Sequence, residues 1–257
     1  MTPSLLAAIL ALLPAGTPAD DPPKDVFIEY RTGARVPGEL AFTDHRGKTV
    51  TFSQYADGTR PVIVVLAYFN CPLLCTLVLN GLTDGLKELE PALGDGFRVV
   101  TVSIDPRDDA ELAAQKRANH LRAYGRAAAD DGWDFLVSQD GGVRQLADTL
   151  GFRYRLDPDS GLYLHAAGAF VLSPDGTLRR TLLGTRFPGL DLRLSLTEAG
   201  EGKYGGFADR MLSWCFRYDV RHYEPALDRI ALVAAGVAAW LSVLVGGIAW
   251  RRSRRAM

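Results

Sequence analysis

Two cysteines four residues apart are the residues of this chain that are best suited to chemistry. Cys71 and Cys75 lie in the stretch YFNCPLLCT and are two of only three cysteines among 257 residues. A pair at this spacing shares one face of a helix. It can close as a disulfide, act as a thiol redox couple, or supply two thiolate ligands to a metal ion. The spacing alone leaves these three possibilities open.

The flanking sequence places the pair where a buried strand gives way to a helix. Residues 61–69, PVIVVLAYF, are typical of a strand buried on both faces, and apolar residues recur at helical spacing from Val78 to Leu89. Pro72 suits the first turn of that helix. Open α/β sheets place their sites at such strand ends, and the helix N-terminus is expected to lower the pKa of both thiols. We therefore favour a functional pair over a structural disulfide, which would close only a very short loop.

A metal site built on two thiolates needs a further ligand, and a histidine is the best candidate. Soft sulfur donors favour copper or zinc over hard cations, and the chain has no second cysteine pair. Among its four histidines, His165 comes just before a strand that we expect beside the strand at 61–69. Without the cysteines, a histidine in that place would be interpreted as a hydrogen-bonded structural residue. His45 is expected in a solvated turn, and His120 on the exposed face of a helix.

The order of predicted elements over residues 37–200 indicates an α/β fold with parallel strand pairings and an antiparallel edge. A hairpin about the DHRG turn precedes them, and a second hairpin turns at Ser173–Pro174–Asp175–Gly176. A helix at 191–200 closes the domain. The buried strands and the helices that alternate with them are predicted at 61–69, 78–89, 97–104, 108–129, 133–138 and 143–150.

The two ends of the chain predict export and a membrane anchor. Residues 1–19 are typical of a secretory signal peptide, and residues 20–36 form an extended leader rich in Pro and Asp. Residues 230–250 carry no charge and would reach roughly 31 Å as a helix, which matches a hydrocarbon core of about 30 Å. The basic tail, 251–257, is then cytoplasmic by the positive-inside rule. A single-pass cell-membrane protein is expected, with its globular domain on the periplasmic or other extracytoplasmic side.

Residues 201–229 are predicted to be a juxtamembrane appendage, rich in aromatic residues and glycine and without clean periodicity. Its Cys215 is interpreted as a buried apolar side chain, with a resolving or partner thiol as the alternative. The composition excludes one class of partner. A formal net charge of -1, with acidic and basic residues mixed, leaves no basic surface for nucleic acid.

Three motifs in combination resemble the Sco/SenC family. They are YFNCPLLC after the first buried strand, VSIDPRDD at 102–109 and LHAAGAFVLSPDG at 164–176. Members of this family are thioredoxin-fold, membrane-anchored copper proteins that help to metallate the copper site of cytochrome c oxidase, with a suggested second role as thiol reductants. The resemblance covers residues 36–200. It implies a thioredoxin-like fold, to which the patterns described above add an N-terminal β-hairpin extension and a C-terminal transmembrane helix.

The resemblance also assigns roles to particular residues. It implies that Cys71, Cys75 and His165 hold one copper ion and that Asp105 has a supporting role. For Asp105, capping of the next helix is an equally good explanation. Thr76 departs from the family pattern, because many members have proline after the second cysteine. The C-terminal position of the anchor is a second departure, and neither removes a predicted ligand.

Two functional hypotheses follow. In the first, the protein is a copper metallochaperone and not an enzyme. The reduced cysteines and neutral His165 hold copper, a thiol reductant keeps the pair reduced, and an oxidase subunit receives the ion. In the second, it is a periplasmic thiol–disulfide oxidoreductase in which Cys71 attacks, Cys75 resolves and no metal is needed. Thioredoxin-like redox motifs usually have two residues between their cysteines, not three, which favours copper. Only the copper hypothesis requires His165.

Overall fold

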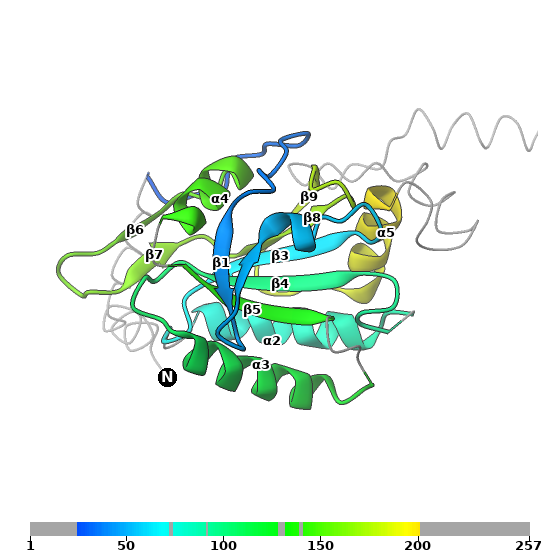
Figure 1. Ribbon diagram of the computed structural model, residues 1–257, viewed down its shortest axis with the longest axis horizontal. Helices are drawn as coiled ribbons and strands as arrows, with labels where there is room; N and C mark the ends of the chain where they lie inside the picture. The colour runs from blue at the N-terminus through cyan, green and yellow to red at the C-terminus, as the bar shows by residue number, and fades with distance from the viewer. Residues whose placement is uncertain (1–24, 72–73, 91, 128–131, 139–140, 201–257) are drawn as a thin grey trace, which may run out of the picture.

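The computed structural model describes residues 25–200, apart from 72–73, 91, 128–131 and 139–140. They form a seven-stranded mixed sheet, a separate two-stranded hairpin and four α-helices (Figure 1). The strands are β1 (Ala41–Asp44), β2 (Thr49–Thr51), β3 (Val62–Ala67), β4 (Arg98–Ser103), β5 (Trp133–Val137), β6 (Tyr154–Leu156), β7 (Tyr163–His165), β8 (Gly168–Leu172) and β9 (Leu178–Leu183). The helices are α2 (Leu74–Lys87), α3 (Ala110–Tyr124), α4 (Gly142–Leu150) and α5 (Gly189–Ala199), with a short 3-10 turn, η1 (Phe52–Gln54).

The large sheet has the strand order β2-β1-β5-β4-β3-β8-β9. Strands β3, β4 and β5 run parallel, whereas β1 joins β5 and β8 joins β3 in antiparallel pairs. All six residues of β3 are buried, as expected for the apolar run at 61–69. The predicted α/β order with an antiparallel edge is therefore confirmed, and β3 is an interior strand between β4 and β8.

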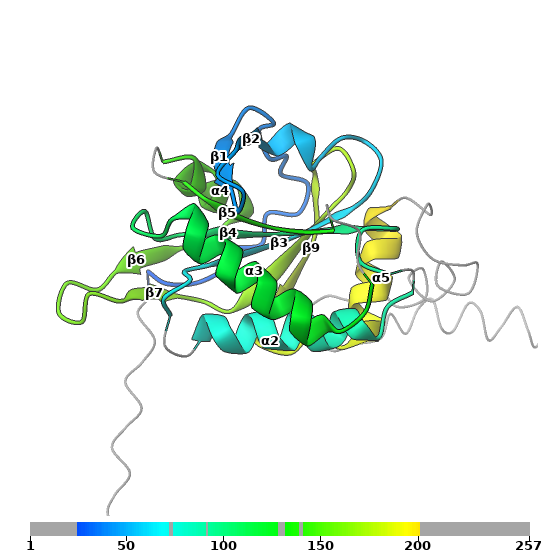
Figure 2. The same ribbon diagram turned by 60° about the horizontal axis from the view of Figure 1, so that its bottom comes forward.

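Three helices cover one face of the sheet, and α4 covers the other. Helices α2 and α3 lie side by side beneath β3, β4 and β5, and α5 contacts α2 near the β8–β9 edge (Figures 1 and 2). Helix α2 approaches the loop before α5 closely, since a Cβ at Gly81 or Gly85 would lie 1.9 Å from the carbonyl oxygen of Thr185 or Phe187. This close contact fixes the helix whose first turn carries Cys75.

The two predicted hairpins are confirmed. Strands β1 and β2 pair about the DHRG turn, where the Asp44 carboxylate accepts from the backbone N–H groups of Arg46 and Lys48. Strands β8 and β9 pair about the turn at 173–176. The structure also shows a hairpin that the sequence analysis did not predict. Strands β6 and β7 form their own two-stranded sheet, which projects from the domain (Figure 1).

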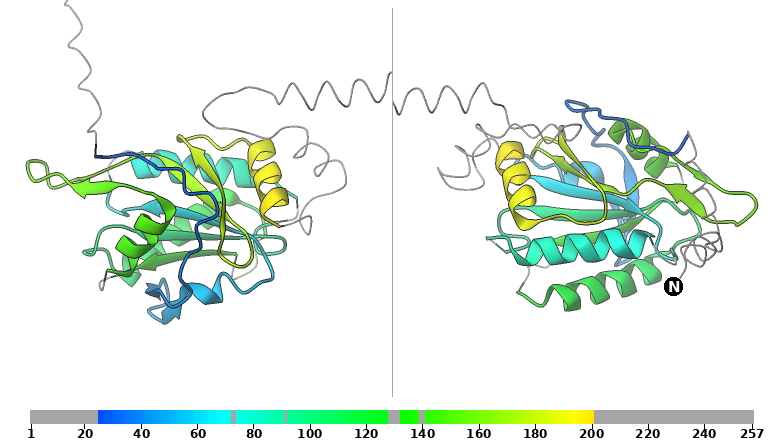
Figure 3. Two further views of the ribbon diagram at one scale, coloured as in Figure 1. Left: turned by 90° about the horizontal axis from the view of Figure 1, so that it is seen from above. Right: turned by 180° about the vertical axis from the view of Figure 1, so that it is seen from behind.

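The described part of the predicted leader runs along the domain (Figure 3). Ile28 forms a β-bridge with Phe152, and Arg35 forms one with Thr177. Residues 25–36 therefore add short antiparallel contacts beside β6 and at the β8–β9 turn. The predicted signal peptide, appendage, transmembrane helix and basic tail lie in residues 1–24 and 201–257, outside the described residues. Within residues 25–200 as described, no helix is long and apolar enough to cross a membrane.

Candidate metal centre

The two cysteines follow the carboxyl end of the interior strand β3, as predicted. Strand β3 ends at Ala67, and a tight turn follows in which the Cys71 N–H donates to the Tyr68 carbonyl (3.2 Å). Helix α2 begins at Leu74 and carries Cys75 in its first turn. Both residues are present as thiols; Cys71 is half-buried and Cys75 is 2% exposed. The loop, not the strand, positions Cys71.

His165 reaches the same edge of the sheet from the projecting hairpin. It is the last residue of β7, three positions before β8 begins at Gly168. Because β8 runs antiparallel to β3, its start lies at the carboxyl end of β3. The predicted position beside β3 is confirmed, although the residue ends one strand as well as preceding another. Tyr154 pairs with His165 across the hairpin, so β6 holds this ligand candidate in place.

Cys71, Cys75 and His165 form one compact group. Their sulfur and ring nitrogen atoms all lie within 4.8 Å of one another. The Cys75 Sγ and the His165 Nε2 lie 2.9 Å apart. Among the described residues, this is the group of cysteine, histidine and acidic side chains whose geometry could hold a metal ion. Ninety residues separate Cys75 from His165 in sequence, and only the fold brings them together.

The hydrogen bonds of His165 set its tautomer. Its Nδ1 lies 2.9 Å from the carbonyl oxygen of Ala166, which can only accept, so Nδ1 carries the proton. The Nε2 lone pair then faces the Cys75 sulfur. Burial lowers the pKa of His165, although the bond to Ala166 opposes this effect. The imidazole is therefore neutral and oriented, as a metal-binding histidine requires.

The pKa of Cys75 differs from the sequence-based expectation. Burial raises it well above the usual range, and this outweighs the backbone N–H that Tyr68 donates to the sulfur from 3.4 Å. The prediction that the helix N-terminus lowers this pKa is wrong for Cys75, because removal from water destabilises a thiolate more than one helix end stabilises it. Cys75 is a thiol until a bound metal ion displaces its proton.

Aromatic side chains surround the group. The Tyr68 ring meets the His165 ring edge-on with 6.0 Å between centroids, and Phe152 packs against His165 at 5.8 Å. Tyr163 packs against Tyr68 at 5.7 Å. Burial raises the pKa of Tyr68, and a hydrogen bond with Cys71 adds to the effect. These rings exclude water from the buried side of the site, which strengthens electrostatic and metal–ligand interactions there.

Asp105 lies outside this group. It is 2% exposed, and its carboxylate accepts three guanidinium hydrogen bonds from Arg107, at 2.7, 2.8 and 3.1 Å, together with the Arg107 backbone N–H. Burial opposes its ionisation, but these bonds hold its pKa below the usual value. Asp105 does not cap the next helix, because Asp109 accepts the N-terminal N–H of Leu112. Asp105 therefore lies in the loop after β4, and its supporting role stays a prediction.

His120 is buried, not exposed as predicted. It is 8% exposed, its ring stacks on Phe135, and its Nδ1 lies 3.2 Å from the Thr83 hydroxyl. The prediction failed because α3 is polar for most of its length, so the narrow strip that faces β5 and α2 is hard to recognise from periodicity. The amphipathic pattern needs a wide apolar stripe to be visible.

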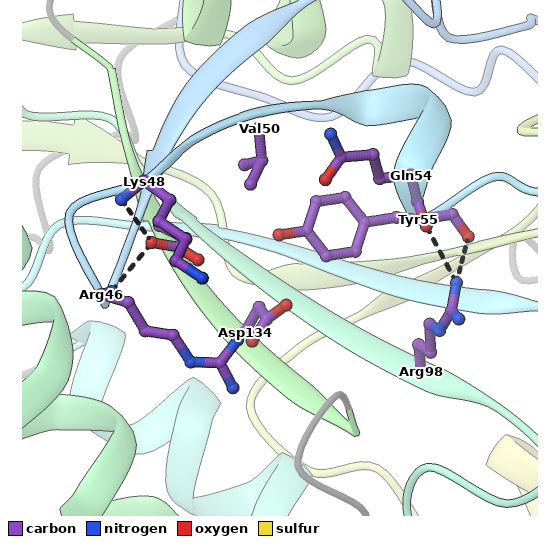
Figure 4. Close-up of a pocket in the computed structure, with 8 residues that line it drawn as sticks. Arg46, Lys48, Val50, Gln54, Tyr55, Arg98 and Asp134 are labelled. Carbon is purple, nitrogen blue, oxygen red and sulfur yellow. Dashed lines mark hydrogen bonds between the residues drawn. The ribbon is translucent and has the colours of Figure 1, made fainter.

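The side chain of His45 is also buried, and it adjoins a polar pocket. Its side chain is 6% exposed, and its Nδ1 lies 3.4 Å from Asp134 Oδ1, because the β1–β2 hairpin folds onto β5. The prediction of a solvated turn residue is wrong for this reason. The pocket beside Asp134, about 260 Å³, is lined by charged and polar side chains that include Arg46, Lys48 and Tyr55 (Figure 4). It contains neither a cysteine nor a histidine in its lining and is separate from the thiol group.

Sequence reasoning missed the hairpin that carries His165. The signal was present, because FRYRL alternates apolar and polar residues and is separated from the apolar and aromatic stretch LYL by the turn-forming residues DPDSG, a pattern typical of a hairpin. It also missed Asp108, whose buried carboxylate bonds to the loop before Cys71. No spacing rule connects an acidic residue after β4 to a loop after β3.

The fold and the site together define a class. This chain is a thioredoxin-like α/β domain in which two cysteines and a histidine form one compact group at the end of strand β3. A family model described as SCO1/SenC matches residues 28–188. The chain therefore belongs to the SCO1/SenC family, which confirms the resemblance drawn from the three motifs.

Solved structures agree on the fold. Two proteins from Aquifex aeolicus VF5, described provisionally as an electron transfer and an electron transport protein, match with TM-scores of 0.56 each. Their identities are 22% and 21%, and they cover 69% and 66% of this chain and 98% and 99% of their own. BsSco, described as a member of the Sco family of cytochrome c oxidase assembly proteins with a disulfide switch, matches at 19% identity and a TM-score of 0.51, over 68% of this chain and 97% of its own. A comparison with curated proteins finds no match.

Proposed function

We propose that this protein binds one copper ion through the sulfur atoms of Cys71 and Cys75 and the Nε2 of His165. The observation that carries the proposal is the convergence of these three atoms within 4.8 Å, with Nε2 turned toward a sulfur. Two thiolates and an imidazole are a soft ligand set that suits Cu(I), and the imidazole accommodates Cu(II) as well. Membership in the SCO1/SenC family supports the choice of copper over zinc.

A competition titration tests copper binding. The full chain, reduced and held in detergent, is titrated with Cu(I) against a chromophoric Cu(I) chelator. We expect one ion per chain, and a loss of affinity on the order of a hundredfold or more in Cys71→Ser and Cys75→Ser, since even outer partners of metal ligands are worth about 10–100-fold. Cys215→Ser is the matched control, because it removes the third thiol, which is not one of the predicted ligands. A wild-type chain that binds no Cu(I), or a Cys71→Ser chain that binds it normally, contradicts the proposal.

The physiological role that we propose is delivery of copper during assembly of a respiratory oxidase. Family membership and the printed description of BsSco support this role. In cells that lack the gene, cytochrome c oxidase should contain less copper and have lower activity, and both should be restored by the wild-type chain but not by His165→Ala. Normal copper content in the oxidase of the deletion strain would contradict delivery, without bearing on copper binding itself.

A thiol–disulfide oxidoreductase is the second candidate function. It is favoured by the closeness of the two sulfurs, which need only a small movement to bond. Oxidation joins the sulfurs, releases two protons and gives two electrons to an acceptor, here a disulfide of another protein that becomes two thiols. The oxidised pair then lacks both thiolate ligands, so a thiol reductant is needed for copper binding. Reduction of a model disulfide that is equally fast in wild type and His165→Ala, combined with no copper binding, would favour this function.

We also propose that the globular domain lies on the extracytoplasmic side of the cell membrane, held by residues 230–250. The support is the uncharged segment followed by four arginines within 251–255. The chain should resist extraction by carbonate. An added protease should digest the domain in spheroplasts and leave the basic tail protected. Release of the chain by carbonate, or protection of the domain from protease, would contradict this placement.

A further inference from the structure

The loop that carries Cys71 is a turn that is held by a residue from another loop. The Tyr68 carbonyl accepts the N–H of Cys71, so Phe69 and Asn70 are the two central residues of a four-residue turn. No helix or strand contains these four residues. The Cys75 backbone N–H donates to the Cys71 sulfur at 3.3 Å, and the backbone of Cys71 itself is placed by whatever holds Phe69 and Asn70.

A single carboxylate holds both central residues. Asp108 Oδ2 accepts the backbone N–H of Phe69 at 2.7 Å, and its Oδ1 accepts the side-chain amide of Asn70 at 3.1 Å. The Ser103 hydroxyl donates to the same Oδ2 at 2.6 Å. All three donors are neutral groups. Asp108 itself is 1% exposed, so water does not compete with these bonds.

The sheet register explains why this carboxylate reaches the turn. Ala67, the last residue of β3, pairs with Ser103, the last residue of β4. The loops that follow the two strands therefore leave the sheet side by side. The Asp108 backbone N–H donates to the Asp105 carbonyl at 3.1 Å, which fixes the second loop. Helix capping does not account for Asp108, because the neighbouring Asp109 provides the N-cap of α3.

We propose that Asp108 is a positioning residue of the copper centre, which holds the Tyr68–Cys71 turn so that the Cys71 sulfur faces the Cys75 sulfur and the His165 Nε2. This inference rests on the proposed copper function. Phe69 and Asn70, held by the carboxylate, leave Cys71 little freedom, so the site loses little conformational entropy when copper binds. Partners that orient metal ligands typically contribute about 10–100-fold to metal affinity.

Substitutions at Asp108 test the inference in the full chain. Asp108→Ala removes all three bonds and should lower Cu(I) affinity by roughly 10–100-fold. Asp108→Asn keeps one acceptor oxygen but turns an NH₂ group toward a donor, so its affinity should fall between those of wild type and Asp108→Ala. Asp109→Asn is the matched control, the same change one residue away, and should leave the affinity unchanged.

Two further readouts separate positioning from a general loss of stability. The sulfur-to-copper charge-transfer band of the Cu(II) form should shift in the Asp108 variants, because the Cys71 sulfur is displaced. A merely structural role would lower the melting temperature and leave the band of the folded protein unchanged. If Asp108→Ala does not fold, Asp108→Asn and Asn70→Ala test the inference in its place. Asn70→Ala removes only one donor and should shift the band in the same direction.

The metal-free protein distinguishes failure of this inference from failure of the proposed function. Alkylation of Cys71, followed by mass spectrometry, should change several-fold in rate in Asp108→Asn and Asn70→Ala but not in Asp109→Asn. A wild-type chain that binds no copper but shows this pattern overturns the copper function and retains the turn as the holder of Cys71. Wild-type copper affinity, band position and Cys71 reactivity in folded Asp108 variants overturn the inference.

Discussion

Two histidines of this protein are buried to the same extent and differ in almost everything else. His165 and His120 are each 8% exposed, and burial lowers the pKa of both. His165 directs its Nε2 at the sulfur of Cys75, with its other nitrogen donating to a backbone carbonyl. His120 lies between α3 and the sheet, stacked on Phe135 and close to Trp133.

The hydrogen bonds of His120 suit packing rather than ligand binding. The Thr83 hydroxyl donates to the Leu79 carbonyl, so it accepts from the Nδ1 of His120. No cysteine or acidic side chain joins His120 in a metal-binding group within the described residues. Burial and a lowered pKa therefore do not by themselves identify a histidine as a metal ligand. What distinguishes His165 is a nitrogen lone pair that faces the sulfur of a cysteine.

The largest expected effect is a difference in copper affinity when each of the two histidines is replaced by alanine. His165→Ala should lower Cu(I) affinity on the order of a hundredfold or more, because it removes a ligand and not merely its outer support. His120→Ala should leave the affinity of the folded protein unchanged. The chelator competition described above measures both. Equal losses in the two variants would mean that His165 acts through packing, as His120 does.

The second prediction concerns His120 and the pH dependence of stability. Burial lowers the pKa of His120 from 6.5 to about 4, with Lys116 contributing. Below pH 6.5 the unfolded chain takes up a proton that the folded chain does not, so the stabilising contribution of neutral His120 is complete above that pH. It is lost as the pH falls toward 4, by on the order of 3 kcal/mol.

Chemical denaturation of the metal-free chain between pH 7 and pH 4 measures this loss. His120→Phe keeps an aromatic ring in the stack and should make the free energy of unfolding less dependent on pH. A smaller slope of the same sign should remain, because the pKa of His165 is also lowered by burial. An unchanged slope in His120→Phe would show that other groups account for the acid sensitivity.

The smallest expected effect on copper binding concerns the ion pair of Arg107 and Asp105, which lies outside the group of Cys71, Cys75 and His165. Arg107 pairs with Asp105 and lies 6.0 Å from the centre of the Tyr163 ring, but its side chain is 65% exposed. The Asp105 carboxylate is buried, so removal of Arg107 takes away the guanidinium bonds of a group that water does not reach. Arg107→Ala should therefore reduce stability by about 1–3 kcal/mol, but it should reduce copper affinity by less than the roughly 10–100-fold of a partner that orients a ligand. A loss of affinity as large as that of His165→Ala would make the Asp105–Arg107 pair part of the centre.

Most of the fold and the thiol pair could be predicted because their signals are local. The buried run of β3 and the hairpin turns are contained in stretches of a few residues, and so is the placement of Cys71 and Cys75 at a helix start. His45 and His120 were misjudged because their burial comes from elements far away in the chain. The pKa of Cys75 was misjudged for a related reason, since a local rule about helix ends omits the desolvation that the surrounding core imposes.

By itself the sequence determined the residue types of the centre, the class of fold and the family, because periodicity and motif spacing are written in neighbouring residues. Only the tertiary structure decided that His165 points its Nε2 at Cys75, and that Asp108 holds the turn before Cys71. Both contacts join segments that are distant in sequence. Strand register and loop packing bring them within hydrogen-bond distance, and those depend on the whole sheet.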